Sequence, residues 1–94
     1  MPVAYNGFSS VAQLIAEVTQ NPAQVSGASV GAESFTVPGA RPGMHFVVSA
    51  PSLEANLGIA GAECTADDTV VVRIINPTAN PINPAEQTFY FIGL

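Results

Sequence analysis

Apolar and polar residues alternate along most of this chain, a pattern that is typical of β-strands. The strongest strand prediction covers residues 69–75, because this segment is dense in β-branched residues. Turn signals such as Pro38-Gly39 separate the alternating segments at intervals of roughly ten residues. This spacing predicts an all-β domain, an antiparallel β-sandwich or barrel. The expected strands are 33–37, 44–49, 57–64, 69–75 and 87–94, and the proline-rich segment 76–84 is expected to be an irregular loop.

One segment near the N-terminus follows a helical period instead. Ser9 and Ser10 are good N-cap residues. After them, apolar residues recur at i, i+3, i+4 and i+7 and so define one helical face. Asn21-Pro22 ends the pattern, because the residue before a proline avoids the α region. We therefore expect one short N-terminal helix near Ser10–Gln20, with residues 1–22 forming an arm and helix and residues 23–94 the β-sandwich domain.

Both faces of the two best-predicted strands are apolar. Strand side chains alternate between the two faces of a sheet. If Val70, Val72, Ile74, Phe89 and Phe91 point inward, the outward set is Val71, Arg73, Ile75, Tyr90 and Ile92. Two interpretations fit this pattern: strands buried on both sides within one domain, or strands whose outer side forms a subunit interface. We name the outward set as candidate interface residues.

The charge content of the chain favours the interface. Only 10% of the residues are charged and 48% are hydrophobic, whereas about 25% are charged in an average soluble domain. A 94-residue chain forms one small domain and buries a limited fraction of its surface. Large exposed apolar patches usually mark interfaces. We therefore expect part of this surface to be buried between subunits.

The net charge of −5, with two arginines and no lysine, argues against two classes of partner. Nucleic-acid binding depends on several Lys or Arg contacts to phosphates. Anionic membrane surfaces likewise attract basic segments. We expect neither nucleic acid nor membrane as a partner. Because cations are scarce, Arg73 is expected to have an acidic partner. Replacing Arg73 by alanine would cost about 3–5 kcal/mol if the pair is buried and about 0–1 kcal/mol if it is exposed; we expect the larger effect, as lost binding or a lost oligomer.

No residue pattern in the sequence supports an enzyme, a cofactor site or a metal site. His45 is the single histidine and Cys64 the single cysteine, so a His–Cys pair would require proximity in the fold. We expect Cys64 to be a small buried residue. Asp67-Asp68, with Glu63 nearby, fits either a solvated turn or a Ca²⁺ site, and the turn is favoured because the spacing matches no EF-hand loop.

The first eight residues lack the pattern of a secretory signal, because no positive segment precedes an apolar one. We interpret the protein as made in a cytoplasm and assembled without export. Tyr5 and Phe8 lie in this arm, and each aromatic ring can bury about 150–250 Å². The arm is expected to dock on a neighbouring subunit or on another protein of the assembly, with Tyr5 and Phe8 as anchors, or to fold back over one end of its own domain.

Several of these segments, in this order, resemble a recurring module of small tailed-bacteriophage proteins, the head decoration or cement proteins. The likeness covers about residues 33–94. The N-terminal third has no counterpart, and Met44-His45 stand where an acidic residue often follows the second Pro-Gly. The segments that carry the likeness are Phe35-Thr36-Val37-Pro38-Gly39-Ala40-Arg41-Pro42-Gly43, Val47-Val48-Ser49-Ala50-Pro51, Leu57-Gly58-Ile59, Asp68-Thr69-Val70-Val71-Val72-Arg73, Asn76-Pro77-Thr78-Ala79 and the aromatic last strand.

The resemblance implies a structural role in a virion. The expected function is that of a decoration protein on the outer surface of an icosahedral head, made in the host cytoplasm, with the major capsid protein and further copies of itself as partners. A trimer is the oligomer that the resemblance implies. The alternative is a subunit or domain of a tail or head fibre that contacts host glycans.

Overall fold

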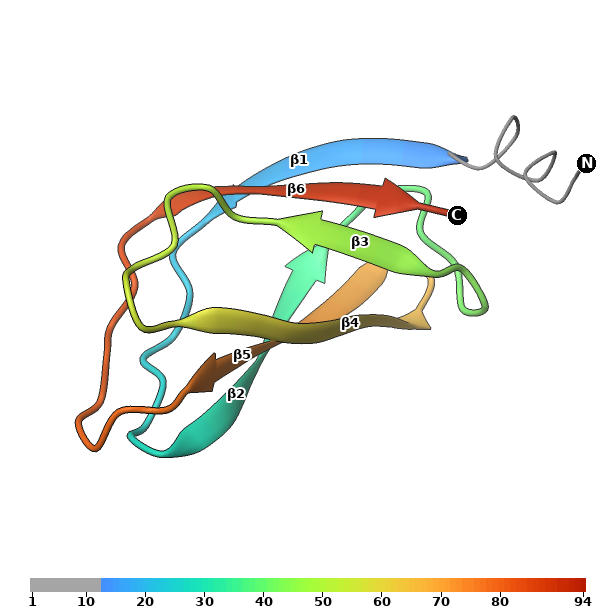
Figure 1. Ribbon diagram of the computed structural model, residues 1–94. Helices are drawn as coiled ribbons and strands as arrows, with labels where there is room; N and C mark the ends of the chain where they lie inside the picture. The colour runs from blue at the N-terminus through green and yellow to red at the C-terminus, as the bar shows by residue number, and fades with distance from the viewer. Residues whose placement is uncertain (1–12) are drawn as a thin grey trace, which may run out of the picture.

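The alternation of apolar and polar residues forms strands throughout the described part of the chain. A computed structural model describes residues 13–94, and these residues contain no helix. They form two antiparallel three-stranded sheets with strand orders β1-β6-β3 and β2-β5-β4, which lie as two layers in Figure 1. The strands are β1 (Leu14–Gln20), β2 (Ser29–Thr36), β3 (Phe46–Ser49), β4 (Gly58–Ala66), β5 (Thr69–Asn76) and β6 (Gln87–Gly93). The predicted all-β class is confirmed.

The helix prediction is wrong for Leu14–Gln20, because this segment is strand β1 and pairs along its length with β6. Leu14 and Val18 fit a helical face, but they also fit the two-residue period that directs Leu14, Ala16 and Val18 toward the core. Tertiary pairing decided between the two periods, since β6 offers a complete row of backbone partners. The β-fold therefore includes Leu14–Gln20, which were expected to form the N-terminal helix. Residues 10–12 of the predicted helix lie outside the described residues.

The core is the space between the two sheets. Phe35 of β2 lies between two aromatic residues of the other sheet, with ring centroids 4.6 Å from Phe89 and 5.3 Å from Phe91. All three rings are at most 1% exposed. Buried aromatic pairs add to the free energy gained from their buried area. The rest of the buried core consists of Val25, Val37, Ala40, Cys64, Val70, Val72 and Ile74. The inward residues predicted for β5 and β6 are thus confirmed.

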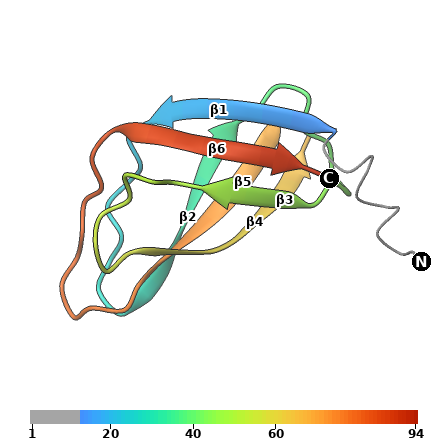
Figure 2. The ribbon, with the colours of Figure 1, turned by 45° about the horizontal axis from the view of Figure 1, so that its top comes forward.

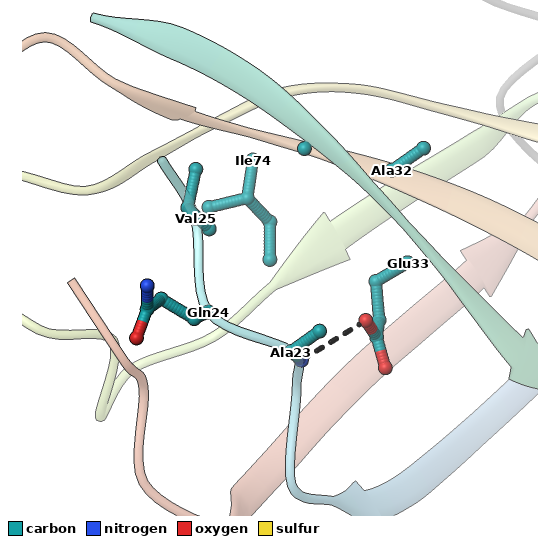
Figure 3. A pocket seen from close by; sticks show the side chains of 7 residues that line it. Ala23, Gln24, Val25, Ala32, Glu33 and Ile74 are labelled. Carbon is teal, nitrogen blue, oxygen red and sulfur yellow. Dashed lines mark hydrogen bonds between the residues drawn. The ribbon is translucent and has the colours of Figure 1, made fainter. Parts of the chain in front are cut away.

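The sandwich is viewed in Figure 2 with the sheet β1-β6-β3 in front and the strands of the second sheet running behind it at an angle. Strand β3 of the front sheet is adjacent to β4 of the rear sheet. At the opposite edge, the Glu33 carboxylate of β2 accepts a hydrogen bond from the Gln20 side chain. It also accepts one from the backbone N–H of Ala23 (Figure 3). These contacts connect the two layers along both edges.

Asp67-Asp68 forms the tight turn between β4 and β5. Asp68 adopts a left-handed conformation with φ of 62°, which aspartate tolerates better than most residues. Its Oδ1 accepts a hydrogen bond from the Gly39 N–H at 2.8 Å. The turn that the sequence favoured at this position is confirmed, and it also fixes the loop that leaves β2.

Candidate interaction surfaces

The outer surface of the sheet β1-β6-β3 carries an apolar row that crosses all three strands. Ile15 is the register partner of Ile92, and Ile92 is also the partner of Val47. The three side chains point away from the core and are 75%, 40% and 56% exposed in that order. We call the outward surface of β1, β6 and β3 the β6 face. Its centre is a row of β-branched side chains exposed to solvent.

The rows on either side of this apolar row are mostly polar. On one side, Glu17, Tyr90 and Ser49 are register partners across the sheet. On the other side, Leu94 is joined to His45 by two backbone hydrogen bonds, and Gln13 precedes β1 on the same surface. Tyr90 is 43% and Leu94 36% exposed. Glu17 has the single acidic side chain in these three rows.

The outer surface of the second sheet is divided differently, and we call it the β5 face. Val30 and Ile75 are register partners at one end and are 52% and 40% exposed. They line a shallow depression of about 270 Å³ that extends to Pro77. The middle of this face is charged, because Arg73 of β5 forms an ion pair with Glu63 of β4 at 3.1 Å. The β5 face therefore combines an apolar end with a charged centre.

The candidate interface residues lie on both of these surfaces. Tyr90 and Ile92 are on the β6 face and are exposed, as predicted. Ile75, Arg73 and the half-buried Val71 are on the β5 face. The structure does not bring the two groups together, because the sheets turn their outer faces in opposite directions (Figure 1). Tyr5 and Phe8 lie outside the described residues.

Sequence reasoning missed Leu94 and three exposed apolar residues that lie within the strands of these faces. Ile15 was assigned to a helix, so its place beside Ile92 was hidden. Val30 precedes the predicted start of its strand at residue 33, whereas β2 begins at Ser29. Val47 lies between the inward residues Phe46 and Val48. The alternation already visible in the predicted strand 44–49 would have found it.

Arg73 has the acidic partner that the sequence predicted, but the pair is not buried in this chain. The side chains of Arg73 and Glu63 are 45% and 59% exposed. An exposed ion pair contributes about 0–1 kcal/mol, because water and salt screen the attraction. The pair is therefore exposed in the isolated chain, where Arg73→Ala is expected to cost about 0–1 kcal/mol of folding free energy, and its burial between subunits stays a prediction.

The residues weighed for catalysis and metal binding are separated by the fold. Cys64 is buried, as predicted, and its thiol donates to the Ala66 carbonyl at 3.1 Å, whereas His45 is exposed. Within residues 13–94 no three His, Cys, Asp or Glu side chains are grouped to hold a metal ion. The cavity beside Val25 and Glu33 (Figure 3) measures about 30 Å³, which is room for water rather than for a substrate.

A depression of about 550 Å³ lies at the end of the sandwich beside Arg41, Met44 and Leu94. Among its described lining residues, Arg41 is the one with a charged side chain. A second depression, of about 240 Å³, extends from Arg41 to Asp67 and Asp68. One of its two carboxylates already accepts the Gly39 N–H. These depressions are open surface, and they do not combine a nucleophile with a base.

Comparison with protein-family models, with curated proteins and with solved structures finds no match to this chain. Within the described residues, the chain has no helix of the length and apolar character needed to cross a membrane. The two outer faces, with their exposed apolar side chains, are the candidate interaction surfaces of this chain.

Proposed function

We propose that this chain is a structural protein of a virus particle and that it decorates the outer surface of a tailed-phage head. The observation that carries the proposal is the pair of apolar surfaces on opposite sides of one small sandwich. Ile15, Ile92 and Val47 are exposed on one side, and Val30 and Ile75 on the other. A protein that joins two neighbours needs two separate adhesive surfaces.

The free energy gained on attachment depends on how much apolar area these side chains bury. Burying apolar surface contributes about 25 cal/mol for each Å² removed from water. Charged side chains would oppose such burial, and the β6 face has a single acidic side chain, that of Glu17. Because the chain would bind only the assembled shell, it would stabilise that shell by mass action. This is the effect expected of a cement protein.

The choice of the phage head as the particle rests on the resemblance of residues 33–94 to decoration proteins. The segments that carry the resemblance form the loop after β2, strand β3 and strands β4 to β6. They therefore include the central strands of both sheets. The N-terminal residues, which carry no resemblance, add the edge strand β1 and its exposed Ile15.

Imaging of particles that contain this chain tests the proposal. We expect protein density over the junctions between capsomers, and we expect heads that lack the chain to lose integrity at lower temperature. Ile75→Thr should weaken attachment if the β5 face contacts the shell. Density at the tail, or in a projecting fibre, would overturn the assignment to the head.

A further inference from the structure

We infer that the β6 face is a self-association surface, on which a second copy of this chain packs face to face about a two-fold axis. This inference rests on the proposed function and deepens it, because it names the partner of one of the two faces; the two-fold dimer differs from the trimer that the resemblance implies. It rests on the order of side chains in the three rows described above. The β5 face is then left for the other partner of the assembly.

The centre of the β6 face can pack against the same residues of a second copy. Ile92 belongs to β6, the middle strand of the sheet, and has Ile15 on one side and Val47 on the other. Two sheets that pack face to face keep their strands within about 30° of each other. If the two-fold axis passes through Ile92, this side chain meets its own copy at any crossing angle. The apolar rows of the two copies then cover each other.

The outer rows are also complementary under this symmetry. With the axis along the apolar row, Glu17 faces Gln13 of the second copy, and Tyr90 faces Leu94. With the axis along the strands, Glu17 faces Ser49 instead, and Leu94 meets its own copy. In both aligned arrangements the carboxylate of Glu17 faces an uncharged hydrogen-bond donor and never the other Glu17. No acidic side chain of these rows faces another acidic side chain across the contact, which is why we choose a second copy as the occupant.

The size of the face sets the expected strength of the dimer. Three strands lie about 4.8 Å apart with about 3.3 Å per residue, and β1 and β6 have seven residues but β3 has four, so the surface measures at most roughly 14 by 23 Å. This area is comparable to the largest apolar patches on monomers, about 300–600 Å². It is smaller than the roughly 800 Å² per partner of a standard interface. We therefore expect a weak dimer, with a dissociation constant above about 1 µM.

Sedimentation equilibrium of the isolated full chain over a wide concentration range tests the inference, and Ile92→Thr is the decisive variant. Threonine keeps the β-branched shape of isoleucine but has a smaller apolar surface and a hydroxyl group. Because Ile92 lies at the axis, the substitution removes apolar surface from both copies at the same contact. Dimerisation should weaken at least about tenfold. Ile75→Thr is the matched control, because Ile75 is also 40% exposed on the middle strand of its sheet. This control should dimerise like the unchanged chain.

Three outcomes would overturn the inference. The first is a full chain that stays monomeric at millimolar concentration, and the second is an equal effect of the two substitutions. The third is a dimer that disappears when Met1–Phe8 is deleted but tolerates Ile92→Thr, which would assign the contact to the arm. Circular dichroism of each variant checks that it is folded. Because no particle is used, a failed dimer is distinguishable from a failure of head decoration.

Discussion

At the scale of single residues, two polar side chains organise the loops at one end of the sandwich. Asn76 is fully buried at the end of β5, and its amide nitrogen donates to the carbonyls of Val25 and Asn80. Its Oδ1 accepts from the N–H and the hydroxyl of Thr78. One side chain thereby fixes the segment after β1 and the proline-rich loop after β5. Glu54 is the second of these side chains, and it connects the loop before β4 to Ala85 and Gln87.

Replacing Asn76 by alanine is expected to lower the free energy of unfolding by about 2–3 kcal/mol, because buried groups lose their partners. Urea denaturation followed by circular dichroism measures the change. Asn80→Ala is the control, since the Asn80 side chain is exposed and its backbone carbonyl accepts the hydrogen bonds. Asn80→Ala should change the free energy of unfolding by no more than about 0.5 kcal/mol. Equal effects of the two substitutions would contradict the role given to Asn76.

Glu54 is expected to make stability depend on pH in the acidic range. The N–H of Ala85 donates to its carboxylate and lowers the pKa below the ordinary value of 4.5, and the Gln87 amide acts in the same direction. A carboxyl group whose pKa is lowered by folding contributes stability above its unfolded pKa. That contribution is lost as the pH falls through the folded pKa.

Glu54→Gln tests this expectation, because glutamine keeps an acceptor for Ala85 but does not titrate. The difference in unfolding free energy between the unchanged chain and the variant should be greatest near pH 6. It should shrink as the pH falls below 4.5. The other carboxyl groups titrate in both proteins and cancel in the difference. A difference that is constant with pH would show that folding leaves the proton affinity of Glu54 unchanged.

At the scale of elements, close approach between loops limits which residues the chain tolerates. A Cβ added at Gly27 would lie 2.3 Å from the backbone oxygen of Ala79. The adjacent residue Ala28 donates its N–H to the carbonyl of Thr78. The loop before β2 and the loop after β5 are therefore in backbone contact, and glycine is needed at Gly27 for space.

Gly27→Ala is expected to destabilise the fold by about 1–3 kcal/mol, because the backbone must shift to accept the methyl group. Gly61→Ala in β4 provides the control, since a Cβ there meets nothing within 4 Å. Alanine at Gly61 should leave stability unchanged or raise it by up to about 1 kcal/mol, because glycine loses more backbone freedom on folding. Thermal unfolding of both variants measures these changes in stability. A destabilised Gly61→Ala would show that β4 is less open than described.

At the scale of the whole molecule, the chain closes a core between its sheets and leaves apolar rows on both outer faces. Exposed edge strands and apolar faces promote association, and β1 is an edge strand that has both features. The sequence left two interpretations for the outward residues of β5 and β6. Ile75, Tyr90 and Ile92 are each at least 40% exposed, so residues 13–94 do not bury these positions on both sides.

Deletion of N-terminal residues distinguishes a role of the arm in attachment from a role in folding. Deleting Met1–Phe8 should leave the isolated domain folded by circular dichroism, because β1 begins at Leu14 and its pairing with β6 is kept. The same deletion should weaken attachment to particles if Tyr5 and Phe8 are anchors. Deleting residues 1–20 should unfold the chain, since it removes β1 and uncovers β6. Unfolding on the shorter deletion would assign the arm to the core of its own domain.

Much of the fold could be predicted from local pattern. The segments around Phe35, Phe46, Val72 and Phe91 are strands, as the sequence predicts, because each is short and bounded by turn residues. The inward side was predicted for the segments around Val72 and Phe91, and it is correct. Strand starts were less accurate: β2 begins at Ser29 and not at residue 33. Gly31 and Ala32 carry little hydrophobic signal, so this extension depends on pairing with β5.

The sequence by itself determined the β class, the turn at Asp67-Asp68 and the inward faces of β5 and β6, because these follow from side chains close together in the chain. Only the tertiary structure decided that Leu14–Gln20 is a strand, since two periods fit that segment until β6 supplied its backbone partners. The tertiary structure also decided which outward residues share a surface. Ile15, Val47 and Ile92 are far apart in sequence, and the strand order β1-β6-β3 places them in one row. Strand order is set by long-range packing, and local periodicity does not encode it.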